Sequence, residues 1–582
     1  MTDLERNPLV VADRLAMPEQ DLSAPFHDPY APGIRTDDTT LMLRAVTLLV
    51  PVGVTLGLGW LSLGWFTLDG NLTLGEAVLT GVTAFAGFWM VLSVATAALG
   101  LFWKPKPRVR PQKGLRVAIL LPMYGEPAQA TMGNALALLA ALSARGLHSF
   151  SLHILSDTRD LSRALVEEAM AAALRQTHPA LSIHYRRRVK NTDFKSGNIR
   201  DWVQGHGAGH DAMLILDADS VMGPGTVLAM ADALAAEPGL GLLQTVPRVL
   251  PGHTLWQALQ SFASEVYGIN MGRGFAMWTG PEGNFLGHNA MVRVRAFATA
   301  AGLPHLPGRA PRGGVILSHD FVEAALLRRA GWGVQMMAGA EDSYEDTPET
   351  LLGYLRRDRR WCQGNMQHLR LIGVPGLHPL SRFHLLQGAM AYLASVWWLI
   401  LLVLWALPGQ DGKMADAFAT NPYLPNWPML PPVTQGTIAV LMGLALMAPK
   451  ALGIIAHVRD HGLAPSDAPR FGLVVLAEVT VSALLAPMQM VHQVRAVLWT
   501  LAGIDGGWKQ HPTGSLTVPQ LARFHVAETL LGAALVTLCA LGLVSPWLLP
   551  VAMSLCLSVG LAALLQMPVS VFYRRKEQRI VA

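Results

Sequence analysis

Long apolar segments on both sides of a more polar central region constrain this chain more than any other feature. A helix needs about 20 apolar residues to cross a bilayer. Of the 582 residues, 51% are hydrophobic and only 15% are charged, whereas soluble proteins carry about 25% charged residues. We therefore predict a multi-pass helical membrane protein. The candidate spans are Ala45–Phe66, Ala77–Phe102, Leu386–Leu407, Gly436–His457 and a hairpin of Leu530–Val544 with Leu549–Phe572.

Basic residues indicate the orientation of these spans. The segment WKPKPRVRPQKGLR follows the second span, and FYRRKEQR lies at the C-terminal end of the sequence. Lys and Arg gather on the cytoplasmic side of membrane proteins, so we expect both termini and the central region in the cytoplasm. The formal net charge of +5 then reports membrane orientation, and we expect no nucleic-acid partner.

Cytoplasmic termini require an even number of crossings, and one stretch decides the count. Residues 472–493 are apolar but contain Glu478, and an ionised acid at the centre of a span costs about 2.5–3.5 kcal/mol. If this stretch is interfacial or re-entrant, six crossings remain, which is our prediction. The expected domains are a loose or disordered cytoplasmic arm (1–40), two transmembrane helices (41–103), a cytoplasmic domain (104–375), and a membrane domain (376–582) of about four transmembrane helices, the 472–493 helix and a loop at 503–514.

The central region has the pattern of an α/β domain. Short apolar runs typical of buried strands alternate with alanine-rich helical stretches such as Asn134–Ala144. This alternation predicts a mainly parallel sheet. The fold class is therefore an α-helical membrane protein with an inserted α/β domain. The predicted strands are Val117–Leu121, Ser151–Leu155, Leu181–Tyr185 and Met213–Leu216.

Two carboxylates follow the last of these strands. Asp217 and Asp219, separated by Ala218, are predicted to lie just beyond a strand's carboxyl end, where open α/β sheets bind ligands. Two carboxylates there can hold a hard divalent cation, which commonly bridges nucleotide phosphates. The pair alone is weak evidence, because an acidic turn after a strand has the same sequence.

Other polar groups are expected at the same edge of the sheet. The first strand leads into a turn with Pro122, Tyr124 and Glu126, and the second ends at Asp157. An aromatic ring with an acid suits a nucleoside, although Gly, Pro and Asp also simply form turns. The segment FKSGN opens a helix before the Asp pair, and Lys195 together with a helix N-terminus can receive phosphate oxygens; a solvated lysine beside a cap is the alternative.

Three further motifs follow the Asp pair. Gly287, His288 and Asn289 stand between apolar stretches, and Asp320 closes the sequence Ser-His-Asp at the start of a predicted helix. Adjacent residues cannot form a hydrolase triad, whose members meet through the fold, but one acid can serve as a general base. The segment LRRDRRWCQGN supplies cations for a diphosphate and an indole against which a sugar can stack; a basic juxtamembrane helix with an interfacial Trp is the plainer interpretation. Its candidate residues are Arg357, Arg360 and Trp361.

The order of these motifs resembles that of processive, membrane-embedded family 2 glycosyltransferases such as cellulose and hyaluronan synthases. Those enzymes carry a first Asp, a lysine-glycine motif, D-x-D, T-E-D and Q-x-x-R-W, in a catalytic domain between membrane segments. Here T-E-D is replaced by Ser318-His319-Asp320, and the Q of the last motif by Arg357. With RRDRRWCQGN and GNFLGHNAMVR, these departures are similar to the osmoregulated periplasmic glucan glucosyltransferase H family of Gram-negative bacteria.

The resemblance implies a GT-A-like domain at the bacterial inner membrane. It implies an inverting transfer of glucose from UDP-glucose to a growing β-glucan, with Mg²⁺ or Mn²⁺ as cofactor. It also implies passage of the product across the bilayer and periplasmic glucan-processing proteins as further partners. Asp320 matches the general base, and Asp219 with Asp217 the metal ligands. Asp157 and Lys195 match the nucleotide-binding positions, and Arg360 with Trp361 the end of the last motif. Together with the motif chemistry above, we expect donor binding by Pro122, Tyr124, Glu126, Asp157, Lys195, Asp217, Arg357 and Arg360, and acceptor binding by Gly287, His288, Asn289 and Trp361.

Two alternatives and two finer hypotheses accompany this interpretation. Another processive β-glycosyltransferase, making cellulose, hyaluronan or chitin, has the same motif order. A transporter with a nucleotide-binding domain is a different class, although no G-x-x-x-x-G-K-[ST] phosphate loop occurs in the sequence. We expect Gly503–Gly514, with Trp508 and Lys509, to be a gating loop. Trp397, Trp398, Trp405 and Tyr392 could line a glucan passage or simply face lipid.

Overall fold

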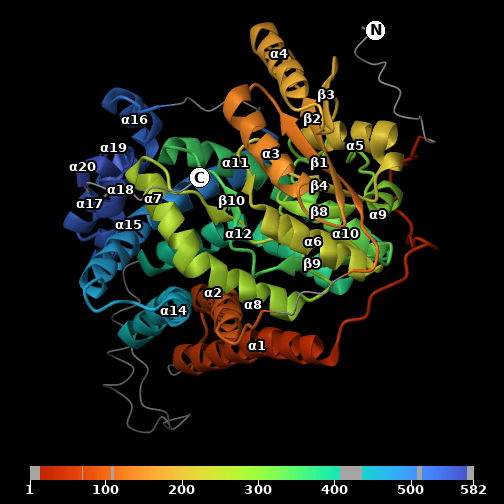
Figure 1. Ribbon diagram of the computed structural model, residues 1–582. Coiled ribbons are helices and arrows are strands. Elements are labelled where there is room, and N and C mark those ends of the chain that lie inside the picture. Colours follow the sequence, from red (N-terminus) through yellow and green to blue (C-terminus); the bar gives the residue numbers. More distant parts are fainter. Residues whose placement is uncertain (1–13, 68–69, 106–110, 407–434, 507–513, 573–582) are drawn as a thin grey trace.

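The computed structural model describes residues 14–67, 70–105, 111–406, 435–506 and 514–572. An α/β domain lies against a layer of long helices (Figure 1). The central sheet has seven strands in the order β3-β2-β1-β4-β8-β6-β9. Only β8 runs antiparallel to its neighbours. The strands are β1 (Arg116–Met123), β2 (Ser149–Ser156), β3 (Ile183–Arg187), β4 (Ala212–Ile215), β6 (Leu240–Thr245), β8 (Ala290–Arg293) and β9 (Gly333–Met337).

Alternating side chains on the strands build one core on each face of the sheet. In β1, Val117, Ile119 and Leu121 face a core shared with the helices α3, α4 and α6, whereas Ala118 and Leu120 face the opposite core, as the two-residue period of a strand requires. The second core contains residues of α5, α9 and α10. These helices are α3 (Ala128–Ser143), α4 (Leu161–Thr177), α5 (Phe194–His206), α6 (Pro224–Ala236), α9 (Val294–Ala300) and α10 (His319–Arg329).

A second, smaller sheet lies beside the end of β4. Its order is β5-β10-β7, formed by β5 (Val221–Met222), β10 (Ser343–Glu345) and β7 (Arg248–Val249). The four strands expected from the apolar runs are confirmed with shifts of one to two residues at their ends. The strands β6, β8 and β9 and the small sheet have no counterpart in the sequence-based prediction.

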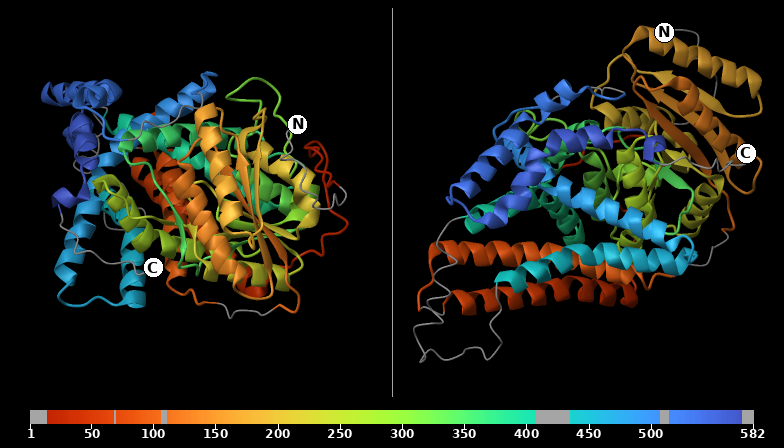
Figure 2. Two further views of the ribbon diagram at one scale, coloured as in Figure 1. Left: turned by 45° about the horizontal axis from the view of Figure 1, so that its top comes forward. Right: turned by 90° about the vertical axis from the view of Figure 1, so that its left-hand side faces the viewer.

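The helical layer contains five helices that are long and apolar enough to cross a membrane, or up to seven if each of two bent helix pairs counts as one span, among the residues that the structure describes. The helices α1, α2 and α14 lie side by side (Figure 2). The five are α1 (Asp38–Phe66), α2 (Leu74–Gly100), α12 (Pro379–Ala406), α14 (Gln435–His461) and α15 (Ala468–Leu501); the bent pairs are α16 (Val518–Phe524) with α17 (Val526–Ala540), and Pro546–Cys556 with α19 (Ser558–Leu565).

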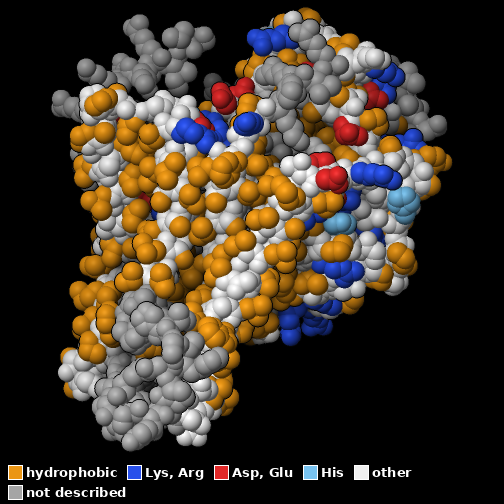
Figure 3. Space-filling model, turned by 90° about the horizontal axis from the view of Figure 1, so that it is seen from below, with side chains coloured by type: hydrophobic (Ala, Val, Ile, Leu, Met, Phe, Trp, Pro, Cys, Tyr) orange, Lys and Arg blue, Asp and Glu red, His pale blue; other side chains and the backbone are white. Residues whose placement is uncertain are grey.

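The exposed face of this layer is largely hydrophobic, whereas charged side chains gather over the α/β domain (Figure 3). Large apolar side chains such as Leu49, Leu56 and Trp60 of α1 are exposed, and exposed apolar surface of this extent marks contact with lipid or protein. Together with the helix lengths, this confirms a multi-pass membrane protein. The count of six crossings stays a prediction.

Residues 472–493 lie within α15, one continuous helix of 34 residues. Glu478, the acid whose charge argues against a membrane crossing, is buried and paired. Lys450 Nζ lies 2.6 Å from its Oε1, and the Tyr267 hydroxyl donates to its Oε2 at 3.1 Å. A paired acid costs much less to bury than an isolated one. Further along α15, Gln493 Nε2 donates to Asp358 Oδ2 at 3.2 Å, so the helix follows the domain boundary.

The structure adds contacts that composition did not indicate for two of the predicted domains, whose boundaries stay predictions. The arm before α1 is not loose over residues 14–37: Asp28 N donates to Ala330 O at 3.0 Å, and the Trp332 indole donates to Asp28 Oδ2 at 3.0 Å. Its polar residues are hydrogen-bond partners of the domain rather than a sign of disorder. Residues 255–279, assigned to the soluble domain, form helices that contact the membrane layer, and Gly274 lies so close to Thr96 O that a side chain would not fit.

Candidate functional site

The carboxyl ends of β1, β2 and β4 meet at one edge of the sheet, because Met123 is in register with Ser156 and Leu120 with Ile215. Glu126, Asp157 and Asp217 follow these three strands. Pro122 is still part of β1, so the turn begins later than the sequence indicated. Glu126 accepts a hydrogen bond from Tyr124 N at 2.5 Å. Burial, reinforced by the negative charges of Glu167 and Asp217, raises the pKa of Glu126.

Lys195 joins the Asp pair to the segment that leads into β8. Its Nζ forms an ion pair with Asp217 Oδ1 and donates to Gly287 O at 2.7 Å. Burial alone would raise the pKa of Asp217, but Lys195 and His288 outweigh it and lower that pKa. Asp217 is therefore ionised at neutral pH, held beside a cation at the strand end.

Asp219, two residues after Asp217, is exposed to solvent. Partial desolvation, followed by the charge of Asp217, raises the pKa of Asp219 to about 6. An excess of negative charge on oxygen ligands is what a hard cation such as Mg²⁺ or Mn²⁺ offsets. The residues therefore fit a divalent cation held by Asp219, with Asp217 beside it.

His288 and Asn289 connect this edge to the small sheet. His288 Nε2 lies 3.1 Å from Glu345 Oε2 in β10; although burial opposes the charged form, Glu345 and Asp217 raise the pKa of His288 to about 9. Asn289 is fully buried, and its amide donates to Ser343 Oγ at 3.1 Å and to Tyr344 O at 3.0 Å. The side chains of His288 and Asn289 thus interact with groups of the small sheet. Their assignment to acceptor binding stays a prediction.

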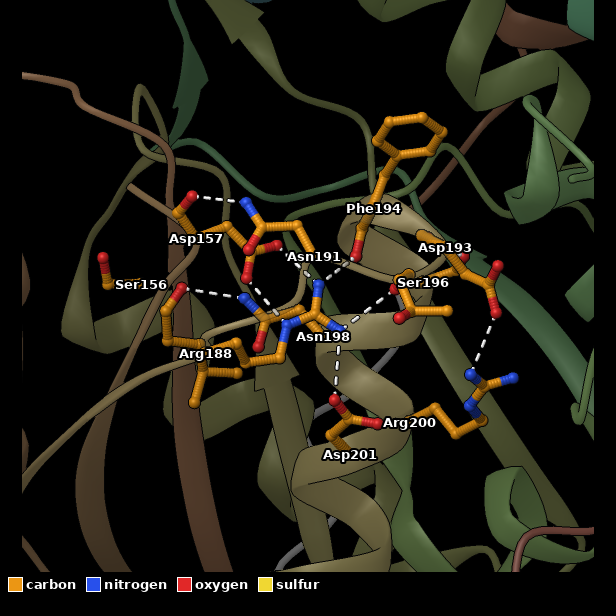
Figure 4. Close-up of polar contacts among 12 residues, drawn as sticks. Ser156, Asp157, Arg188, Asn191, Asp193, Phe194, Ser196, Asn198, Arg200 and Asp201 are labelled. Atoms are coloured by element: carbon orange, nitrogen blue, oxygen red, sulfur yellow. Dashed lines mark hydrogen bonds and ion pairs between the residues drawn. The ribbon is translucent and has the colours of Figure 1, made fainter. Parts of the chain in front are cut away.

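Asp157 belongs to a polar network that positions the loop before Lys195. Arg188, which follows β3 at the same sheet edge, binds the Asp157 carboxylate with two contacts of 2.7 Å (Figure 4). Arg188 also donates to Phe194 O at 2.9 Å and to Asp201 Oδ2 at 3.0 Å. The loop is thereby fixed on both sides of its residues with positive φ, Asp193 and Phe194. Lys195, the next residue, is held toward Asp217.

Asp320, like Lys195, lies next to Gly287. Gly287 has φ +94°, and a Cβ built there would lie 3.0 Å from the Asp320 carboxyl carbon, so the carboxylate approaches the glycine closely. His319 Nδ1 lies 3.1 Å from both Asp320 Oδ1 and Glu323 Oε1. Burial opposes protonation of His319, but Glu323 and Asp320 raise its pKa to about 9. A cationic imidazole thus accompanies the candidate base.

The helix α11 (Leu351–His368) carries Arg357, Arg360 and Trp361. The Arg357 guanidinium lies over the Trp361 ring at 4.6 Å, and the Trp361 side chain is 45% exposed, which leaves part of the indole open to a ligand. The C-terminal half of α11 is joined to the residue before His319: Gly364 lies against Ser318, and His368 Nε2 lies 2.9 Å from Ser318 O. The position of Trp361 is therefore tied to that of Asp320.

The sequence motifs did not indicate four residues of this arrangement: Arg188, Glu323, Glu345 and Asn191, whose amide donates to Asp157 O at 2.5 Å. Arg188 could have been found from the run RRR that ends the third predicted strand, at the edge where Asp157 ends the second. Glu323 could have been found from its i,i+4 spacing from His319 on the predicted helix. Glu345 gave no comparable indication, because its partner His288 is distant in sequence. Most of the expected gating loop, including Trp508 and Lys509, lies outside the described residues.

The fold and site together define a class. Residues 212–410 match the sequence profile of glycosyl transferase family group 2, and this match, with the mainly parallel sheet between long apolar helices, confirms the predicted fold class, a helical membrane protein with an inserted GT-A-like α/β domain. Family 2 glycosyltransferases are inverting enzymes, and this match supports a glycosyltransferase rather than a transporter with a nucleotide-binding domain.

Relatives identify the branch of this class. The chain is 40% identical over 485 residues to the glucans biosynthesis glucosyltransferase H of Vibrio cholerae, covering 80% of this chain and 67% of the relative. It is 39% identical over 512 residues to the protein of that name from Shewanella sp. strain ANA-3, covering 85% and 70%. The chain belongs to the glucans biosynthesis glucosyltransferase H family. It is thus a membrane glucosyltransferase, as the sequence motifs indicated.

Among solved structures, a mannosyltransferase from Pyrobaculum calidifontis in complex with GDP-Man and Mn²⁺ is similar at 15% identity, covering 73% of this chain and 99% of that one, with a TM-score of 0.42.

Proposed function

We propose that this enzyme transfers glucose from UDP-glucose to the growing β-glucan backbone of osmoregulated periplasmic glucans. The reaction would take place on the cytoplasmic face of a bacterial inner membrane, and the product would pass between the membrane helices. One observation carries the proposal: Gly287 brings the donor and acceptor sides together, since its carbonyl accepts from Lys195 while its backbone lies against the Asp320 carboxylate. A lysine for the diphosphate and a carboxylate for the attacking hydroxyl then both adjoin one residue.

On the donor side, Asp157 and the Tyr124–Glu126 turn would contact the nucleoside, and Lys195 a diphosphate oxygen. The Lys195–Asp217 pair is only partly exposed, so the attraction between its ammonium and a phosphate is less screened than in bulk water. Asp219 and Asp217 would hold the divalent cation, which when bound offsets negative charge on the departing diphosphate. Arg357 and Arg360 on α11 would contribute further positive charge.

On the acceptor side, Asp320 would take the proton of an acceptor hydroxyl as its oxygen attacks the anomeric carbon of glucose. The bond between that carbon and the UDP oxygen breaks in the same step, which inverts the α-linked donor to a β-linked product. His319, with its pKa of about 9, keeps a positive charge beside Asp320 at neutral pH. The exposed face of Trp361 would stack against the acceptor sugar.

Purified enzyme in lipid nanodiscs tests the proposal directly. With radiolabelled UDP-glucose, we expect polymer to form with Mg²⁺ or Mn²⁺, to stop with EDTA, and to resume when the cation is restored. Asp219→Asn should lose this activity, whereas Glu168→Gln, the same kind of chemical change on the outer helix α4, should keep it. Linkage analysis of the product, with GDP-mannose and UDP-N-acetylglucosamine as competing donors, examines the sugar. EDTA-resistant polymerisation, or preference for another donor, would contradict the proposal.

A further inference from the structure

Three side chains with metal-binding atoms meet in the helical layer, away from the Asp pair. His492 of α15, His525 at the break between α16 and α17, and Glu528 of α17 each offer one ligand atom, and these atoms lie within 4.8 Å of one another. His492 Nε2 lies 3.0 Å from Glu528 Oε1, and His525 Nδ1 lies 3.9 Å from Glu528 Oε2. Small side-chain adjustments would bring all three onto one ion.

The burial of these groups is unusual for a plain ion-pair cluster. The side chains of His525 and Glu528 are fully buried. Neither ring nitrogen of His525 has a hydrogen-bond partner among the described residues, and neither does Glu528 Oε2. Buried polar atoms are normally paired, and each exception calls for an explanation such as a bound ion. Arg495, whose Nη1 lies 3.3 Å from Glu528 Oε1, accounts for that oxygen only.

We infer that His492, His525 and Glu528 form a site for a zinc-like cation that cross-links α15 to the bend between α16 and α17. Two imidazoles and one carboxylate suit Zn²⁺, which takes nitrogen and oxygen ligands in a tetrahedral arrangement with water in any open position. The same set disfavours Mg²⁺, which prefers oxygen ligands. Oε2 of Glu528 serves the cation while Oε1 keeps Arg495, so the neighbouring guanidinium is compensated.

The helix α15, which carries His492, packs against α11, the helix that carries Trp361. Gln493, the residue after His492, donates to Asp358 of α11, and the Arg359 guanidinium of α11 lies over the Trp499 ring of α15 at 4.1 Å. The bend at His525 joins the same assembly, since Leu521 of α16 shares a hydrophobic cluster with Leu355 of α11. A cation that fixes α15 to this bend therefore supports α11 from the membrane side. Its expected effect on glucosyltransferase turnover rests on the proposed function, whereas the binding of zinc does not.

Metal analysis of the full-length protein in nanodiscs tests the inference. After an EDTA wash and reloading with one equivalent of ZnCl₂, we expect about one zinc per chain by mass spectrometry and a higher melting temperature. His525→Ala should lose the zinc and the shift in melting temperature, His525→Cys should restore both because thiolate is a zinc ligand, and the exposed-histidine control His178→Ala should retain both. Asp219→Asn should lose glucosyltransferase activity and still bind zinc.

The wild-type measurement stands even if a variant fails to fold. Wild-type protein without zinc after reloading, or with no shift in melting temperature, overturns the inference. So does loss of zinc in Asp219→Asn, because the ion would then occupy the proposed catalytic site. Zinc retained with Asp219→Asn inactive supports both proposals; zinc retained with Asp219→Asn active supports the zinc site and contradicts the catalytic assignment.

Discussion

The two sides of the candidate site are built in different ways. The donor side consists of carboxylates that follow β1, β2 and β4, whose positions follow from the register of a parallel sheet, and of Lys195 at the start of α5. The acceptor side consists of Asp320 at the start of α10 and Trp361 on α11. It is positioned by the contact of His368 with Ser318 within the domain and by that of Gln493 with Asp358, which joins α11 to α15 of the membrane layer.

This difference has a functional meaning. Nucleotide-sugar binding requires fixed charges in one place, which a sheet edge supplies through its hydrogen-bonded strands. On the proposed function, a growing polymer leaves the site toward the membrane, and α11 contacts both Ser318 of the domain and α15. Substitutions on the two sides should therefore affect different steps, and each prediction below examines one side or the link between them.

The largest effect is expected where the two sides meet. Asp320→Asn removes the proposed base while keeping its shape, and general-base catalysis contributes about 10²–10⁴-fold. We expect turnover to fall by about 10³-fold while UDP still binds, as measured by calorimetry alongside the polymerisation assay. Near-normal polymerisation by this variant would show that another group accepts the proton.

The donor side is examined by Lys195→Gln. The variant leaves Asp217 without its cation and the diphosphate without an ammonium, so we expect kcat/KM for UDP-glucose to fall by about 10²-fold. Lys190→Gln, an exposed lysine of the preceding loop, is the matched control and should behave like wild type. If both variants lose activity equally, the charge of the loop as a whole matters rather than the Lys195 ion pair.

The acceptor side is examined by Trp361→Ala and Trp361→Phe. Ring stacking contributes about 0.5–1.5 kcal/mol, so the alanine variant should raise the KM for an added glucan acceptor by about 3–10-fold and shorten the product. The phenylalanine variant should recover most of the loss, and the KM for UDP-glucose should not change in either. A change confined to the KM for UDP-glucose would mean that Trp361 acts on the donor side, and would contradict the prediction.

The smallest effect concerns the pH dependence of stability through His319. Its folded pKa of about 9 lies above the unfolded value, so its stabilising contribution is complete below about pH 6.5 and is lost as the pH rises through about 9. We expect His319→Gln to lower the stability by on the order of 2 kcal/mol at pH 6. The melting-temperature difference from wild type should shrink toward pH 9.5; a constant difference would mean that His319 is neutral throughout.

Much of this arrangement could be predicted from the sequence. Runs of apolar residues determine the helical layer, because a bilayer admits few other structures. Alternating strands and helices determine the sheet, and the acidic residues at strand ends fall on one edge because parallel strands point the same way. Lys195, Asp217 and Asp320 can be recognised from the sequence alone, because their order along the chain matches a family pattern.

Only the tertiary structure decided the partners of these residues. The approach of Gly287 to Asp320 joins segments separated by more than 30 residues, and that of Arg188 to Asp157 depends on the pairing of β2 with β3. The ordered arm at residues 14–37 and the meeting of His492 with His525 have the same origin. The composition of a segment indicates the structure that it prefers in isolation. Hydrogen bonds and packing between distant segments determine its surroundings in the folded protein, and no local sequence pattern encodes these long-range interactions.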